Sequence, residues 1–340
     1  MREGKYMIFY GAGAAGSGHR REGMGCQDHH RIFRLQNGGM GLVCADGVSS
    51  ASMAQLASAR ASRTAEDFIK RNYPLKGDNA SVLALLNGAM NCSMKALWQL
   101  ARDGGQEEGE YDTTLMIALM TGSGEEEGTQ GHSVYTAGVG DGGIIGLSDS
   151  GRYQILYEPV KAEDGSSVIP LRWGPSCWQI KKAEGRYVSV LAATDGLLDA
   201  LFMPPILKLD PYGPRMDIPM LQDFMNPEVL GEKAESRRML QEYVEGRILD
   251  GGDLAEVTDD DRTVLALIDP VCRVPVLEPS YYEAPDYTRL QQVQDDLIRG
   301  IMSDAREVSS KVWSPVTPEF FWSLSVRRRG DACQGEKQVT

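Results

Sequence analysis

The chain alternates between short apolar runs and longer segments in which apolar residues recur at helical spacing. Four of the runs have the length and the β-branched content of strands that are buried on both faces. We predict these strands at residues 41–45, 134–140, 188–194 and 262–268, with two further strands at residues 7–10 and 111–120. We therefore expect a core that is built from strands.

Two segments between these strands predict helices. In residues 50–73, alanines and one phenylalanine recur every three or four residues. A second apolar stripe begins at Val82. Asp78 or Asn79 can cap the start of this second helix, and Gly104 should end it.

The remaining segments predict how the chain is divided. Residues 203–252 begin rich in proline and continue with a helical pattern, so we expect an inserted flap that projects from the body. Beyond Pro270 the sequence is typical of extended chain, then of an amphipathic helix over residues 288–308, and finally of a disordered tail. We therefore predict a catalytic domain at residues 1–270 and a C-terminal extension at residues 271–340.

The composition is that of a soluble globular protein. Of the 340 residues, 42% are apolar and 24% are charged, and no run reaches the roughly 18 apolar residues that a membrane span needs. The six cysteines are scattered without a CxxC pair, which favours reduced thiols in a cytoplasm. The net charge of −13 argues against nucleic acid or an anionic membrane as the main partner. We expect a cytoplasmic protein.

A glycine motif near the N-terminus raises the question of a nucleotide site. Gly11, Gly13 and Gly16 spell GxGxxG directly after the apolar residues 7–10. A dinucleotide site needs a helix after the third glycine, because the first amides of that helix hold the pyrophosphate. Here further glycines interrupt the following segment, and no apolar residues recur at helical spacing. We therefore interpret GAGAAG as a loop that leads out of the first strand.

Carboxylates recur where the predicted strands end. Three apolar runs are followed directly by Asp-Gly, at Asp46, Asp141 and Asp195, and a fourth is preceded by the acidic triplet 259–261. Asp-Gly is also a common hairpin turn, and this alternative fits the Asp-Gly pairs that follow no apolar run. The repeated order of strand and carboxylate favours a functional site.

Several carboxylates at one place raise one another's pKa unless cations compensate them. Oxygen ligands favour hard ions such as Mg²⁺ or Mn²⁺, and the histidines and cysteines lack the spacing of a zinc site. Two such ions would activate a water molecule and hold phosphoryl oxygens. The sequence therefore indicates a binuclear metal-dependent hydrolase.

Six motifs follow one another along roughly residues 5–270. They are CQD (26–28), ADGVSSASMAQLAS (45–58), YDTTLMIALM (111–120), AGVGDGGIIGLSDSG (137–151), LAATDGLLDALF (191–202) and DDDRTVLALI (259–268). This order resembles the protein phosphatase 2C family of metal-dependent serine/threonine phosphatases, and GHRREGMGCQD is similar to a bacterial branch of it. The resemblance implies an α+β fold, namely a four-layer αββα sandwich in which helices flank two antiparallel sheets.

The resemblance also implies a metal site with two, or possibly three, Mn²⁺ or Mg²⁺ ions. Asp46 would bridge two ions, and the carbonyl of Gly47 would bind one of them. Asp195 and Asp260 would complete the other ion. Asp141 would hold a metal-bound water or a third ion.

Other residues would act on the water and on the substrate. Asp28, beside Gln27, would orient a metal-bound water that attacks phosphorus directly, without a covalent phosphoenzyme. His19 is a candidate proton donor to the leaving group, or a histidine that merely binds a loop. Arg20 or Arg21 could bind the substrate phosphate.

Three positions depart from the family pattern. Gly23 stands where better-known members carry the arginine that grips phosphate, Val48 stands where some carry a histidine general acid, and Gln27 replaces a glutamate. We expect an active phosphatase whose phosphoprotein substrates are made by a bacterial serine/threonine kinase. The alternative is a catalytically weak regulatory module that binds a phosphoprotein or a kinase.

Overall fold

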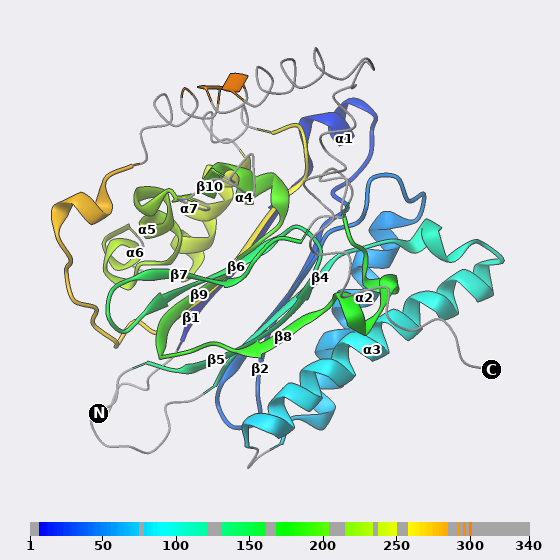
Figure 1. The fold of residues 1–340 in the computed structure, drawn as a ribbon, viewed down its shortest axis with the longest axis horizontal. Helices are drawn as coiled ribbons and strands as arrows, with labels where there is room; N and C mark the ends of the chain where they lie inside the picture. Colours follow the sequence, from blue (N-terminus) through cyan, green and yellow to red (C-terminus); the bar gives the residue numbers. More distant parts are fainter. Residues whose placement is uncertain are drawn as a thin grey trace, which may run out of the picture.

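The computed structural model describes residues 7–74, 78–121, 131–160, 168–203, 215–233, 237–249 and 258–284, and a few isolated positions between 292 and 300. Two five-stranded antiparallel sheets lie face to face in it (Figure 1). The first sheet has the order β1 (Ile8–Ala14), β12 (Arg262–Ile268), β9 (Tyr187–Ala193), β6 (Gly143–Ser148) and β7 (Tyr153–Tyr157). The second has the order β2 (His29–Arg34), β3 (Met40–Ala45), β4 (Leu115–Thr121), β5 (Ser133–Val139) and β8 (Gln179–Lys182). A short pair, β10 (Phe202–Met203) and β11 (Arg215–Met216), lies apart from both sheets.

The layer between the sheets is apolar because successive residues of a strand point to opposite faces. In β12, Leu265 and Leu267 belong to the cluster between the sheets, whereas Val264, Ala266 and Ile268 belong to the cluster under the helices. The central strands are therefore buried on both faces. This explains why they form continuous apolar runs in the sequence.

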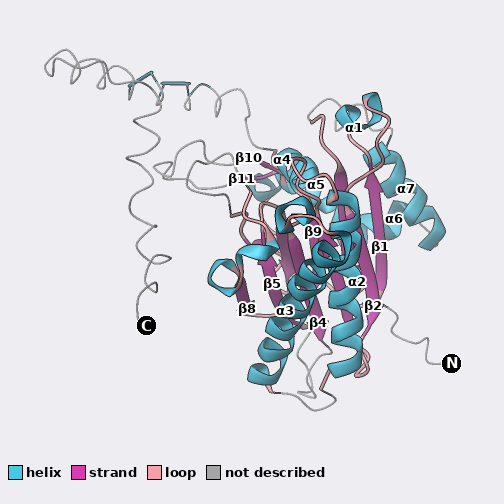
Figure 2. Cartoon of the chain, turned by 90° about the vertical axis from the view of Figure 1, so that its right-hand side faces the viewer, coloured by secondary structure: helices cyan, strands magenta, loops and turns pink. Residues whose placement is uncertain are grey.

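Helices cover the outer face of each sheet and complete four layers (Figures 1 and 2). On the second sheet lie α2 (Ala54–Asn72) and α3 (Asn79–Gly104). On the first lie α4 (Asp195–Leu201), α5 (Ile218–Met225) and α7 (Arg237–Leu249), with α6 (Pro227–Lys233) packed against α5 and α7. The predicted four-layer αββα sandwich is confirmed. Across the described ranges, no helix has both the length and the apolar character that crossing a bilayer requires.

Both long predicted helices form, and local chemistry sets the ends of α3. The side chain of Asp78 accepts a hydrogen bond from the Ser81 N–H at 2.9 Å, as an N-cap does. At the other end Gly105 adopts the left-handed conformation with φ of 63°, which a glycine takes without strain. The small residues that recur in α2 are buried, so this helix can lie close to both α3 and the sheet.

The segment predicted to be a projecting flap belongs to the body of the fold where the structure describes it. Residues 215–249 contain α5, α6 and α7, and Leu221, Phe224 and Val244 are fully buried in the cluster on the first sheet. The prediction was wrong here because the apolar face of these helices covers an outer sheet face that would otherwise meet water. The boundary after residue 270 stays a prediction.

Residues 271–284 run back over the first sheet. The hydroxyl of Tyr281 accepts a hydrogen bond from the Tyr153 N–H at 2.7 Å, and its ring lies 5.5 Å from the Arg152 guanidinium. This segment is therefore fastened to β7. The predicted helix at residues 288–308 lies almost wholly outside the described residues, as does the predicted disordered tail.

Gly11 and Gly13 of GAGAAG lie within β1, and Gly16 precedes α1, so the prediction of a loop at Gly11 and Gly13 was wrong. Gly11 and Gly13 pair with β12 in an unbroken antiparallel ladder. A Cβ atom at Gly11 would come within 2.9 Å of the ring of His30, which lies on β2 of the opposite sheet. The absence of side chains therefore lets the two edge strands approach around this imidazole.

A helix of five residues, α1 (Ser17–Arg21), follows β1. Its presence differs from the predicted flexible loop, yet it does not create a dinucleotide site. Such a site requires parallel strands joined by a crossover helix, whereas β1 is antiparallel to β12. The strand topology therefore supports the interpretation that this segment is not a dinucleotide-binding site.

A histidine–aspartate pair joins the two sheets at the end where β5 begins and β12 ends. His132 Nε2 lies 2.7 Å from Asp269 Oδ2, and its Nδ1 lies 3.1 Å from the Thr121 carbonyl oxygen. The ring thus lies between two acceptor groups, one at the end of β4 and one just after β12. Burial acts to raise the pKa of Asp269, but the hydrogen bonds from His132 and from the Val271 N–H outweigh it and lower this pKa to about 2.

We expect Asp269→Asn to lower the free energy of unfolding by about 2 kcal/mol near neutral pH. The folded pKa lies below the ordinary value of 3.8. The stability that the carboxylate contributes is therefore present above about pH 4 and is lost as the pH falls toward about 2. Urea unfolding of both proteins across this range checks the prediction. A difference that stays constant down to the most acidic pH would contradict it.

Candidate metal centre

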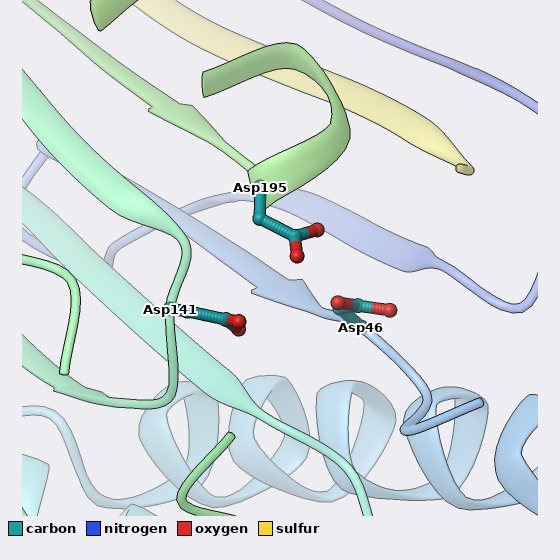
Figure 3. A group of neighbouring side chains, drawn as sticks. All are labelled: Asp46, Asp141 and Asp195. Atoms are coloured by element: carbon teal, nitrogen blue, oxygen red, sulfur yellow. The ribbon is translucent and has the colours of Figure 1, made fainter. Parts of the chain in front are cut away.

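Three of the predicted carboxylates meet between the two sheets, at one end of the sandwich. Asp46 follows β3, Asp141 follows β5, and Asp195 follows β9 as the first residue of α4. One oxygen atom of each carboxylate lies within 4.8 Å of the others. Figure 3 shows the three side chains pointing toward one another.

The strand order explains why these side chains converge. β3 and β5 both pair antiparallel with β4, so they run in the same direction and end at the same edge of the second sheet. β9 of the first sheet ends above that edge, as Figure 3 shows. Rigid strand ends from both sheets thus hold carboxylates that are far apart in the sequence.

Two threonines before β4 fix the backbone that carries Asp46. The Asp46 N–H donates to Thr114 Oγ1 at 2.9 Å, and the Asp46 carbonyl accepts from the Thr113 hydroxyl at 2.7 Å. A Cβ atom at Gly47 would lie 2.7 Å from the carbonyl oxygen of Ala54, at the start of α2. The turn therefore has room only for glycine at position 47, and its backbone is held from two sides.

Asp28 lies directly behind Asp46. Its Oδ2 accepts a hydrogen bond from the Thr194 hydroxyl at 2.8 Å, and the two carboxyl groups share a further hydrogen bond. Burial raises the pKa of Asp28 to about 6, although the hydrogen bonds with Asp46 and Thr194 act in the opposite direction. Burial, followed by the charges of Asp28 and Asp195, raises the pKa of Asp46 well above its ordinary value. The negative charges of these neighbouring carboxylates thus act on one another.

A model of the protein phosphatase 2C family matches residues 15–229, which is more than half of the chain. The chain belongs to the protein phosphatase 2C family. The match includes Asp28 and the three converging aspartates. The chain is therefore a protein phosphatase.

Solved structures of low identity are similar to this phosphatase. A bacterial serine phosphatase variant is 14% identical, with a TM-score of 0.50, and the match covers 80% of this chain and 100% of that chain. Stp1 of Staphylococcus aureus, a serine/threonine phosphatase, is 15% identical with a TM-score of 0.47, and covers 79% of this chain and 97% of its own. The S. agalactiae serine/threonine phosphatase is 13% identical with a TM-score of 0.48, covering 77% and 99%. No curated protein sequence matches the chain.

Asp260 of the phosphatase does not join the group of three carboxylates. Its side chain is exposed, and its Oδ1 accepts a hydrogen bond from the Asp261 N–H at 2.8 Å. It nevertheless lies close by, because its Cβ is 3.4 Å from the position that a Cβ of Gly196 would take. Its charge is also among those that raise the pKa of Asp46. Its role as a metal ligand stays a prediction.

The neighbouring Asp261 is a residue that the sequence reasoning missed. Its buried carboxylate accepts hydrogen bonds from the Gly16 N–H at 2.7 Å, the Gln27 N–H at 2.5 Å and the His19 ring at 2.8 Å. It therefore closes the base of the loop that carries α1. The only signal in the sequence is its place as the third member of the acidic triplet.

The loop residues predicted to act on the substrate lie in different surroundings. The side chain of His19 is 14% exposed and bonds to Asp261. Arg20 and Arg21 are both exposed, and Arg21 forms an ion pair with Asp259 at 3.2 Å. Gln27 contributes its backbone N–H to the loop closure. Its Oε1 atom is buried, with no hydrogen-bond donor among the residues that the structure describes.

The donor set of this phosphatase fits a hard divalent cation. All the converging side-chain atoms are oxygens, and one oxygen of each of the three carboxylates lies within 4.8 Å of the others. Asp28 Oδ1 and Gln27 Oε1 add two buried acceptor oxygens that lack a donor within the described ranges. Buried acceptors and crowded carboxylates both favour a cation with bound water over an empty apolar cleft.

Proposed function

We propose that this phosphatase hydrolyses phosphoserine and phosphothreonine in proteins with the help of two or three Mn²⁺ or Mg²⁺ ions. The convergence of Asp46, Asp141 and Asp195 within 4.8 Å supports the proposal. Oxygen-only donors select such ions over zinc or copper.

Asp46, the Gly47 carbonyl, Asp195 and Asp260 would hold two ions, and Asp141 would hold a third ion or a water. When bound, the ions supply charge that neutralises the phosphoryl oxygens and lowers the pKa of water. Asp28 would accept a hydrogen bond from the attacking water and aim it at phosphorus. Its position supports this role, because the Thr194 hydroxyl holds one of its oxygens and the other is buried without a donor among the described residues.

For the substrate phosphate we favour Arg20 over Arg21. Both side chains are exposed on α1, but Arg21 is engaged with Asp259. Within the described ranges Arg20 forms no ion pair, so its guanidinium can bind phosphate oxygens in the two-pronged geometry that arginine favours. Arg20→Ala is the variant that tests whether Arg20, and not Arg21, binds the substrate phosphate.

A regulatory module that binds phosphoproteins without turning them over is the second candidate. The observation that favours it is Gly23, which replaces the expected arginine, adopts φ of 70° and has no atom within 4 Å of the position of a Cβ. No side chain grips phosphate from this position. We also propose a bacterial serine/threonine kinase as the opposing enzyme and the cytoplasm as the place of action, on the resemblance of GHRREGMGCQD to the bacterial branch.

The test is hydrolysis of a phosphothreonine peptide and of p-nitrophenyl phosphate with Mn²⁺, with Mg²⁺ or with EDTA. We expect activity that requires the ion and that falls by roughly three orders of magnitude in Asp195→Ala. Calorimetry with Mn²⁺ should show weaker binding by the variant. Tight Mn²⁺ binding by the wild type without turnover of either substrate would favour the regulatory module instead.

A further inference from the structure

We propose that His19 and Asp261 form a proton-delivery pair in which Asp261 positions the ring and His19 Nε2 protonates the departing serine or threonine oxygen. This inference rests on the proposed function, because it concerns the leaving-group side of the same reaction. It gives the phosphatase a general acid although Val48 stands where some relatives carry a histidine.

The hydrogen bonds of Asp261 fix the proton on a particular ring nitrogen. Its carboxylate already accepts from two backbone amides, those of Gly16 and Gln27. A carboxylate with this surrounding is an acceptor and not a donor. The Nδ1 atom of His19, 2.8 Å from Asp261 Oδ1, must therefore donate. Nε2 is left as the nitrogen that can exchange a proton with a substrate.

The same hydrogen bonds hold the ring in place. Gly16 and Gln27 stand at the two ends of the loop that carries α1, so Asp261 clamps both ends of this loop and His19 between them. A Cβ atom at Gly16 would lie 2.1 Å from the Asp259 carbonyl oxygen. The loop therefore lies directly on the acidic triplet. A proton donor needs such fixed geometry more than it needs charge.

Asp261 also connects His19 to both sides of the carboxylate group. Its carbonyl oxygen would lie 2.1 Å from a Cβ at Gly196, the residue after Asp195. Its carboxylate binds the N–H of Gln27, the residue before Asp28. Asp261 thus links His19 to Asp195 through the adjacent Gly196, and to Asp28 through the adjacent Gln27. The side chain of His19 is 14% exposed, so part of it stays open to solvent.

The proposed step conserves atoms and charge. The bond between phosphorus and the serine or threonine oxygen breaks, and its electron pair stays on that oxygen, which takes the proton from His19 Nε2. Phosphorus forms a new bond to the oxygen of water, which releases a proton to solvent. The neutral ring regains a proton from solvent before the next turnover. The charged groups near the pair are the Arg21–Asp259 ion pair, between α1 and the acidic triplet, and the buried Arg262, which interacts electrostatically with both Asp261 and Arg20.

The closing experiment compares two leaving groups. Nitrophenolate leaves without protonation, whereas the alkoxide of threonine requires it. We expect His19→Gln to lower kcat on a phosphothreonine peptide by about 100-fold or more, and kcat on p-nitrophenyl phosphate by less than about threefold. Asp261→Asn should change the ratio of the two rates in the same direction, by about tenfold. In the double variant, the ratio should be no worse than in His19→Gln alone.

A matched control is available in the same chain. His132→Gln breaks the other histidine–aspartate pair, which lies before β5, at the end of that strand remote from Asp141. It should alter stability and leave the ratio of the two rates unchanged. If Asp261→Asn fails to fold, the two rates of His19→Gln alone still test the proposal of proton delivery.

Each outcome separates this inference from the proposed function. An equal loss on both substrates in His19→Gln would overturn proton delivery and leave His19 as a loop anchor, while the phosphatase activity would stand. Absence of metal-dependent turnover by the wild type would overturn the proposed function and the proton-delivery pair together. A selective loss on the phosphothreonine peptide would support both.

Discussion

Asp46→Asn is expected to lower metal-dependent hydrolysis by roughly three orders of magnitude or more. An amide keeps the shape of the carboxylate but removes the charge that attracts a divalent ion. The backbone of residue 46 should stay in place, because its hydrogen bonds with Thr113 and Thr114 involve only main-chain atoms of this residue. Steady-state kinetics on both phosphate esters, with a titration of Mn²⁺, gives the loss.

The same variant should be more stable than the wild type when EDTA is present. Burial and the charges of Asp28 and Asp195 raise the pKa of Asp46, so its ionised form destabilises the fold near neutral pH. We expect a gain of about 1 kcal/mol in the free energy of unfolding. A variant that loses activity and stability together would show that the fold was damaged and would contradict the assignment of Asp46 as a ligand.

Gly196→Ala is expected to lower activity by about 100-fold and to destabilise the fold by about 1–3 kcal/mol. The new Cβ atom would lie 2.1 Å from the carbonyl oxygen of Asp261. Because that atom belongs to the backbone, the start of α4 must move away from the acidic triplet. Such a shift displaces Asp195 from the other carboxylates. Thermal unfolding together with hydrolysis of p-nitrophenyl phosphate measures both effects.

Gly246→Ala is the matched control for this substitution. Gly246 lies within α7, and no atom lies within 4 Å of the position of its Cβ. Alanine favours a helix over glycine by about 1 kcal/mol. We expect unchanged activity and slightly higher stability. Equal losses in the two variants would show that replacing a glycine matters more than the contact with Asp261.

The converging carboxylates could be predicted from the sequence because each carries a local signature. A buried strand appears as a continuous apolar run, and Asp46, Asp141 and Asp195 each follow such a run directly. No pairing of strands needs to be known to see this order. The layers of the fold followed from the same runs together with the resemblance of the ordered motifs to a known family.

Asp261 could not be distinguished from its neighbours in this way. Three identical residues stand in a row, and only their long-range contacts separate an exposed ion-pair partner from a buried clamp. The contact between Gly16 and Asp261 joins residues 245 positions apart. A local pattern carries no information about such a pair.

The predictions of a loop at the β1 glycines and of a projecting flap were wrong for a related reason. A glycine in the sequence can indicate a position without room for a side chain. At Gly11, however, the neighbour that occupies this room is His30, which lies on the other sheet. Likewise, an amphipathic helix pattern does not say which surface it covers. In both cases tertiary packing determined the structure, and the local pattern allowed more than one outcome.

The pairing of β1 has a consequence for how the enzyme is made. β1 leaves the ribosome long before β12 (residues 262–268), although β12 is its hydrogen-bonded neighbour in the sheet. Until that strand emerges, β1 has no ladder to join and the loop of α1 has no Asp261 to close it. A nascent chain therefore cannot close this end of the site before β12 has been made, and phosphatase activity must follow the synthesis of that strand.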